Sequence, residues 1–266
     1  MEEIKNQYLS YLNLTLERPS INYLQRLIQH HLIRIPYETF SKFHYFNQRR
    51  ELVPSLDQFV HNLTNRGWGG TCYTLNINFG RLLRELGFSI HFVRVTPGHL
   101  GIMVDIEGKK LYADVGYGSP IMKPVELESR RKHVLHGFGE EITFTQKDQA
   151  LYEIDRKSNG KSFVKKEIIW LPLDEEDLDR DIEASYQDRE DNVVMRRITA
   201  VRFHGNTCYF LRNGTIKAMT YRNIREYQMR DIDKWINTVN EIYHFDKESI
   251  QESVDFLQER NIKIFT

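Results

Sequence analysis

The first third of the chain carries apolar residues at the three- and four-residue spacing of amphipathic helices. Ser20 is a typical N-cap residue, and Ser55 with Gln58 has the spacing of a capping box. A third helix is expected from Cys72, and Gly87 stands where such a helix ends. The apolar stripes of these three predicted helices are Leu24, Leu27, Ile28 and Leu32; Leu56, Phe59, Val60 and Leu63; and Leu75, Phe79, Leu82, Leu83 and Leu86.

Beyond residue 87 the apolar period changes to two, which is typical of strands, as in Ile102, Val104 and Ile106. Three turn sequences predict hairpins between such runs: Glu107-Gly108-Lys109, Asn159-Gly160 and Asn213-Gly214. Near the end, Asp231 is placed to cap another helix, whose stripe is Ile232, Trp235, Ile236, Val239 and Tyr243. Helices, then strands, then a mixed segment indicate an α+β fold without the βαβ alternation of nucleotide-binding folds.

The composition narrows the class of protein. Of the 266 residues, 40% are hydrophobic and 12% aromatic, as in an ordinary globular chain. The 37 Lys and Arg residues balance the 37 Asp and Glu residues, so no overall charge favours nucleic acid or a membrane as a partner. The N-terminal residues lack the layout of a signal peptide, and no apolar run is long enough to span a membrane. Two cysteines are too few for a disulfide scaffold, so we expect a cytoplasmic protein.

The segment 67–72, Gly-Trp-Gly-Gly-Thr-Cys, favours a reactive thiol at Cys72. The adjacent Gly69 and Gly70 allow a tight turn and the close approach of another molecule to the backbone. Thr71 can cap the following helix, which places Cys72 in the first turn. There the free backbone N–H groups and the helix dipole favour the thiolate. The alternative is a buried cysteine that packs as a small hydrophobic residue.

A thiolate nucleophile needs a base, and the base needs an orienting group. His99 differs from the helical histidines because it follows a Pro-Gly pair at the entry to a strand, and Asp114 lies on the returning strand. A hairpin that turns at residues 108–109 places Asp114 opposite Met103. The separation from His99 is then roughly 13 Å at ~3.3 Å per residue. A hydrogen bond between His99 and Asp114 therefore needs a register shift or a bulge.

Four segments resemble the arylamine N-acetyltransferase family, in the order expected for it. Residues 68–76 read Trp-Gly-Gly-Thr-Cys-Tyr-Thr-Leu-Asn, and the family's nucleophile motif is commonly Arg-Gly-Gly-x-Cys-(Phe/Tyr)-Glu-x-Asn. Residues 98–100 (Gly-His-Leu) and 114–118 (Asp-Val-Gly-Tyr-Gly) resemble its histidine and aspartate segments. Upstream, residues 31–40 resemble its His-Leu-Leu-Arg-Ile-Pro-Phe-Glu-Asn-Leu. The resemblance thus spans most of the chain.

The resemblance implies a fold of three parts. These are a helical domain at residues 1–86, a central antiparallel β-barrel at residues 87–190 and a C-terminal α/β lid at residues 191–266. The catalytic core would be of the cysteine-protease and transglutaminase kind. The resemblance also implies acetyl-CoA as the acyl donor, a small arylamine or hydrazine as the acceptor, and no metal.

The resemblance assigns roles to particular residues as well. Cys72 would take the acetyl group from the thioester, His99 would accept the thiol proton, and Asp114 would hold His99. Backbone N–H groups would stabilise the oxyanion. The residues carried over to ligand contacts are Tyr37 and Tyr117 for the acceptor, and Thr96 and Gly98 for the pantetheine arm of CoA.

Two positions depart from the family pattern. Trp68 stands where the family usually has arginine, and Thr74 where it usually has glutamate. The family's arginine pairs with a glutamate, which corresponds to Glu38 here, and a tryptophan cannot make that ion pair. We expect Arg66 to be a replacement partner for Glu38.

Two other functions stay open at this point. The first is another Cys-His-Asp acyltransferase or hydrolase that does not use CoA. The second is a catalytically weakened family member that acts as a binding module. The intact Cys72, His99 and Asp114 argue against the second, since drift would be free to remove them.

Overall fold

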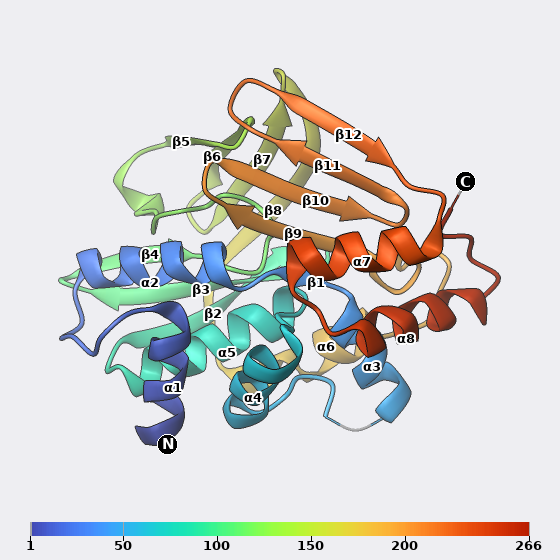
Figure 1. Cartoon of the computed structure of the whole chain (residues 1–266). Coiled ribbons are helices and arrows are strands. Elements are labelled where there is room, and N and C mark those ends of the chain that lie inside the picture. The colour runs from blue at the N-terminus through green and yellow to red at the C-terminus, as the bar shows by residue number, and fades with distance from the viewer. Residues whose placement is uncertain (1, 50, 266) are drawn as a thin grey trace.

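The computed structural model describes residues 2–49 and 51–265. Its N-terminal part is helical, and the helices are α1 (Glu2–Leu12), α2 (Ile21–Arg34), α3 (Phe40–Gln48), α4 (Leu56–Arg66) and α5 (Cys72–Glu85). A short strand, β1 (Tyr37–Glu38), lies between α2 and α3. Figure 1 shows these blue and teal helices gathered on one side of the molecule. The three helices expected in this region are confirmed, and α1 and α3 are added to them.

The predicted helix ends follow from the capping residues. The Ser20 side chain accepts the N–H of Tyr23, and the Ser55 side chain accepts the N–H of Gln58. The capping box at Ser55 is only half formed, because the Gln58 amide donates to another side chain in α4. Gly87 takes a left-handed conformation after α5, which an L side chain rarely adopts.

The middle of the chain forms a curled, antiparallel seven-stranded sheet, which corresponds to the predicted central barrel. Its strands are β2 (Ser89–Thr96), β3 (His99–Ile106), β4 (Lys109–Ala113), β5 (Lys132–Gly137), β6 (Glu140–Asp148), β7 (Leu151–Ser158) and β8 (Lys161–Leu173). They lie in the order β4-β3-β2-β8-β7-β6-β5. Register shifts interrupt the β2–β8, β6–β7 and β7–β8 pairs, and such irregularities bend strands and increase their twist.

The C-terminal part adds a five-stranded sheet and two helices, as expected for an α/β lid. Its elements are β9 (Thr199–His204), β10 (Thr207–Arg212), β11 (Thr215–Met219), β12 (Ile224–Gln228), α7 (Ile232–Tyr243) and α8 (Lys247–Gln258). The helix α6 (Asp179–Ser185) precedes them. The strand β1 pairs with β9, so the N-terminal part contributes an edge to this sheet. In Figure 1 the helix α7 lies beside the orange strands, and α8 lies next to α7 and α3. The predicted cap at Asp231 is confirmed, because its side chain accepts the N–H of Lys234.

The cores explain how these parts hold the start of α5 in place. One cluster of buried side chains joins α1, α2, α4 and α5 to β2, β3 and β4. A second joins α3 to α7, α8 and the five-stranded sheet, with the rings of Phe43 and Phe256 stacked 4.2 Å apart. The N-terminus of α5 therefore meets the β3–β4 hairpin.

The predicted domain boundaries stay predictions. Within the described residues, no helix combines the length and the apolar character needed to cross a membrane.

Candidate active site

The glycine turn before α5 fits tightly against the N-terminal segment. A Cβ on Gly69 would lie 1.9 Å from the carbonyl oxygen of Pro36, and Gly70 has a φ of +136°. The Glu38 N–H donates to the Gly70 carbonyl oxygen at 2.9 Å. Thr71 is the N-cap residue, but its side chain makes no capping hydrogen bond. Cys72 is thus the first residue of α5, as predicted, and Thr71 caps it with its backbone alone.

His99 and Asp114 form a buried hydrogen bond. His99 Nε2 lies 2.7 Å from Asp114 Oδ2. The expected pairing of Asp114 with Met103 was wrong by two residues. Met103 pairs with Tyr112 instead, and continuing this register places Asp114 opposite Gly101. The reason is that the tight turn falls one residue earlier, at 107–108, where both residues have a positive φ. Asp114 is therefore two positions from His99 rather than four, and no bulge in this hairpin is required.

Asp114 is held by three further donors. It accepts hydrogen bonds from the Tyr112 hydroxyl at 2.7 Å, Asn76 Nδ2 at 3.0 Å and the Gly116 N–H at 2.9 Å. Sequence reasoning gave no role to Tyr112 or Asn76. The available signal was that Asn76 follows Cys72 by four residues, and such residues share one face of a helix. Asn76 thus ties the helix that begins at Cys72 to Asp114.

The charges of the three groups reinforce one another. Burial raises the pKa of Asp114, but the His99 charge and the hydrogen bonds outweigh it and hold that pKa below its usual value. Burial also opposes the charged imidazole, yet Asp114 and the thiol raise the pKa of His99 to about 9. For Cys72, burial raises the pKa, while the hydrogen bond and charge of His99, with Lys42 and Lys166, lower it overall. Asp114 occupies Nε2, which leaves Nδ1 as the ring nitrogen for the hydrogen bond between His99 and the thiol. The arrangement favours a thiolate beside an imidazolium.

Cys72 and His99 open onto a cavity of about 690 Å³, which suits a small molecule. Tyr37, Tyr117 and Gly98 line it, as does Cys72. The Tyr117 ring lies 4.5 Å from the His99 ring, centre to centre. Of the residues predicted to contact ligands, Thr96 alone does not line this cavity. It borders a neighbouring hollow on β2 and β8, where its hydroxyl lies 3.5 Å from the Glu167 carbonyl oxygen.

The two departures from the family motif are packed into the interior. Trp68 is 2% exposed, and its indole N–H donates to the Ser249 hydroxyl of α8 at 2.8 Å. The expectation that Arg66 pairs with Glu38 was wrong, because Arg66 lies over the Trp68 ring at 4.2 Å and forms ion pairs with acidic residues 246 and 248. Glu38 instead accepts the N–H and the hydroxyl of Ser41, and burial raises its pKa to about 7.

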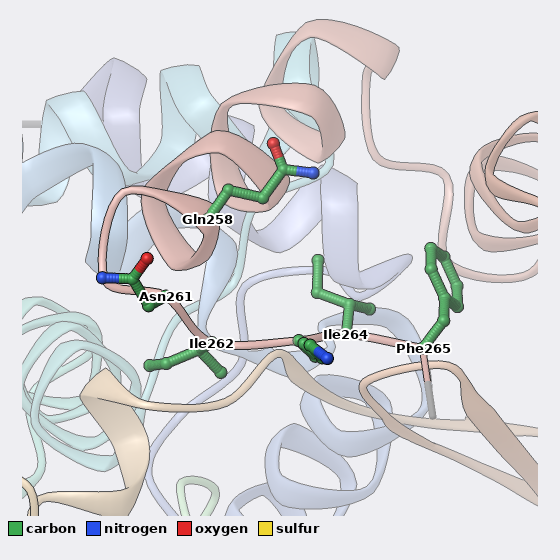
Figure 2. A pocket seen from close by; sticks show the side chains of 6 residues that line it. Gln258, Asn261, Ile262, Ile264 and Phe265 are labelled. Carbon is green, nitrogen blue, oxygen red and sulfur yellow. The ribbon is translucent and has the colours of Figure 1, made fainter.

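Figure 2 shows another pocket, of about 420 Å³, at the end of α8. Its lining residues are Gln258, Asn261, Ile262, Lys263, Ile264 and Phe265. None of these is a cysteine, a histidine or a carboxylate, so this pocket offers no counterpart of the Cys72, His99 and Asp114 group. In the part of the chain that the structure describes, no group of three His, Cys, Asp or Glu side chains is arranged to hold a metal ion.

Comparisons with known proteins show which proteins this chain resembles. A family model described as N-acetyltransferase matches residues 20–251. An uncharacterized acetyltransferase of Acanthamoeba polyphaga mimivirus is 33% identical over 121 residues, which is 41% of this chain and 57% of that protein. The pineal gland isozyme of arylamine N-acetyltransferase from Gallus gallus is 26% identical over 129 residues, or 43% of each chain. The chain thus spans about half the length of these curated relatives.

The fold has solved counterparts. The structure of Mycobacterium marinum arylamine N-acetyltransferase in complex with CoA superposes with a TM-score of 0.80 at 17% identity, covering 98% of this chain and 99% of that one. At this sequence identity the structural similarity shows a shared fold, and the match to the family model shows membership of the family. The helical part, the curled sheet and the α/β lid all take part in the match. The chain belongs to the arylamine N-acetyltransferase family.

Proposed function

We propose that this protein transfers an acetyl group from acetyl-CoA, through a thioester on Cys72, to the amino group of a small arylamine or hydrazine. The observation that carries the proposal is the chain of contacts from Cys72 to His99 to Asp114 at one wall of the 690 Å³ cavity. Family membership supports the acetyl donor and the class of acceptor. A cytoplasmic setting fits the reaction, because a reducing compartment keeps the free Cys72 as a thiol.

The first half-reaction forms the acetyl-enzyme. The Cys72 thiolate attacks the thioester carbonyl of acetyl-CoA, and the carbonyl oxygen becomes an oxyanion. The side chain of Thr71 does not cap α5, so N–H groups of its first turn remain to stabilise that oxyanion. When the carbon–sulfur bond to CoA breaks, the imidazolium of His99 supplies the proton that the departing thiolate takes. CoA leaves as a thiol, and His99 is then neutral.

The second half-reaction regenerates the thiolate. The amine attacks the acetyl carbonyl on Cys72, and neutral His99 takes the proton that the nitrogen must lose. The bond between carbon and the Cys72 sulfur breaks, and the product is an amide. The enzyme returns to the thiolate–imidazolium pair that Asp114 stabilises. Tyr37 and Tyr117 contribute aromatic faces to the cavity in which an arylamine would lie.

The test is to incubate the protein with acetyl-CoA and follow it by intact-mass spectrometry. A gain of one acetyl group, located on Cys72 by peptide mapping and discharged by an arylamine with release of the amide, supports the proposal. Cys72→Ala should gain no acetyl group, whereas Cys208→Ala should react as the wild type, because Cys208 is buried on β10 away from the cavity. Labelling that is independent of Cys72, or none at all, would rule the proposal out.

The same experiment separates the alternatives. A hydrolase or acyltransferase that ignores CoA would leave Cys72 unlabelled by acetyl-CoA but would react with an amide or ester donor. A binding module would react with neither class of donor.

A further inference from the structure

The cavity holds a buried lysine that takes no part in the proton and acetyl transfers proposed above. Lys42 of α3 lines the cavity although its side chain is almost wholly inaccessible to solvent. Its Nζ donates to the Ser185 hydroxyl at 3.0 Å and lies 3.3 Å from the centre of the Tyr186 ring. Across residues 2–49 and 51–265, no carboxylate forms an ion pair with Lys42. Among the described residues, the buried Lys42 ammonium therefore contacts only a hydroxyl and an aromatic face.

This arrangement is costly for the positive charge. Burial lowers the pKa of Lys42 to about 7, and the negative charge on Cys72 only partly opposes that shift. A charge removed from water without a counter-ion gains far more from an anionic partner than an exposed charge does. An anionic group bound at Lys42 would therefore stabilise the ammonium, because it would supply the counter-charge that no described carboxylate provides.

The rest of the cavity wall has the same excess of positive charge. Several lining charges are already neutralised in pairs: Arg156 with Glu140, Arg189 with Asp191, and Asp181 with Arg94. Lys42, Lys166 and Arg197 line the cavity without an ion pair to any described carboxylate. Lys166 contacts the Pro97 carbonyl oxygen, and Arg197 donates to a threonine hydroxyl. The wall is therefore set up to receive a negatively charged ligand.

We propose that Lys42 binds the carboxylate of the acceptor, so that the preferred substrates are aromatic amines bearing an acidic group. This inference rests on the proposed function and names its substrate class. Lys42 acts on the reacting end of the cavity, because its charge stabilises the Cys72 thiolate. The phosphates of CoA are separated from its sulfur by the long pantetheine arm, so they lie away from Lys42 when the thioester is at Cys72. A compact acceptor can place an amine near Cys72 and a carboxylate near Lys42 at the same time.

The test compares two ligands of the same shape and different charge. Calorimetric titration of unacetylated protein with 4-aminobenzoate and 4-aminobenzamide measures the preference for the carboxylate. We expect the wild type to bind 4-aminobenzoate at least tenfold more tightly, as for a charge-assisted contact. Lys42→Met should abolish that preference, and Lys147→Met, which removes an exposed lysine far along the sheet, should retain it. Equal binding of both ligands to the wild type, or an undiminished preference in Lys42→Met, would overturn the inference.

Two controls keep the result decisive. Circular dichroism verifies the fold of Lys42→Met, and Lys42→Gln, which can still donate to Ser185, replaces it if the methionine variant is unfolded. The affinity for CoA is measured in parallel and should be unchanged. If Lys42→Met instead weakened CoA binding while sparing the carboxylate preference, Lys42 would belong to the donor site and the inference would be wrong. Because these titrations need no turnover, a Lys42-dependent preference without acetyl transfer would count against the proposed reaction alone.

Discussion

Replacing Asp114 by asparagine should switch off the reactivity of Cys72 while leaving the sulfur in place. The carboxylate is the main influence that raises the pKa of His99 from its ordinary 6.5 to about 9, which corresponds to roughly 3 kcal/mol of preference for the charged ring. Burial alone would lower that pKa, so in Asp114→Asn the imidazole should be neutral at pH 7. The thiol then loses the positive charge that lowers its pKa most, and that pKa should rise toward the ordinary 9.0.

The size of the effect follows from the fraction of thiolate. A thiol whose pKa is 9 is about 1% ionised at pH 7, and each unit of depression multiplies that fraction about tenfold. We therefore expect Asp114→Asn to slow the alkylation of Cys72 by iodoacetamide at pH 7 at least tenfold. The rate is followed from pH 5 to 9 by mass spectrometry of the Cys72 peptide, which excludes any signal from Cys208.

The matched control is Asp155→Asn, which neutralises another buried carboxylate of the same sheet, one that accepts the Ser162 hydroxyl at 2.5 Å. Its alkylation profile should match that of the wild type. If Asp114→Asn, verified as folded by its thermal transition, kept the wild-type profile, the thiolate could not depend on the His99–Asp114 pair. The electrostatic reasoning would then be refuted.

Three further perturbations probe the surroundings of Cys72. Trp68→Phe removes the hydrogen bond to Ser249 and should lower the free energy of unfolding, measured by chemical denaturation, by about 1–3 kcal/mol. It should also slow Cys72 alkylation. The control Trp170→Phe, which removes the hydrogen bond from Trp170 to Glu128, should leave the alkylation rate unchanged. Folding raises the pKa of Glu38 to about 7, so the folded state holds the Glu38 proton more tightly than the unfolded state does. The free energy of unfolding should therefore fall as pH rises from about 4.5 to 7. Glu38→Gln should flatten that part of the stability–pH curve, and an unchanged slope would disprove the prediction. Gly116→Ala would put a Cβ 2.8 Å from the Cys72 Cα and 2.7 Å from Asn76 Nδ2, so acetyl transfer should drop at least tenfold, and near-normal activity would show that this contact can relax.

The sequence was most informative where local chemistry decides the structure. Caps at Ser20, Ser55 and Asp231 determine where helices begin, and the glycine pair before Cys72 determines how closely that loop packs. The hairpin register could not be predicted in the same way. It depended on Glu107 adopting a positive φ, which its residue type does not favour.

The missing members of the site were those defined by contacts between distant segments. The environment of Lys42 is made by Ser185 and Tyr186, well over a hundred residues later in the chain. Nothing in the periodicity of α3 distinguishes a lysine facing solvent from one buried against those residues. The hydrogen bond from Tyr112 to Asp114 spans only two residues, but it becomes part of the site because the β3–β4 hairpin brings Asp114 to His99.

The contact between Trp68 and Ser249 has a consequence for the order in which the molecule is completed. The loop that presents Cys72 is tied to the start of α8 by this hydrogen bond, by the ion pairs of Arg66, and by Gly67 packed against the backbone of His244. During synthesis, residues 66–72 leave the ribosome long before residues 244–249 exist. A nascent chain therefore carries Cys72 before it has the residues that anchor the Cys72 loop. The loop around Cys72 can therefore reach its native packing only after residues 244–249 have been synthesised, so its anchoring is a late step in folding.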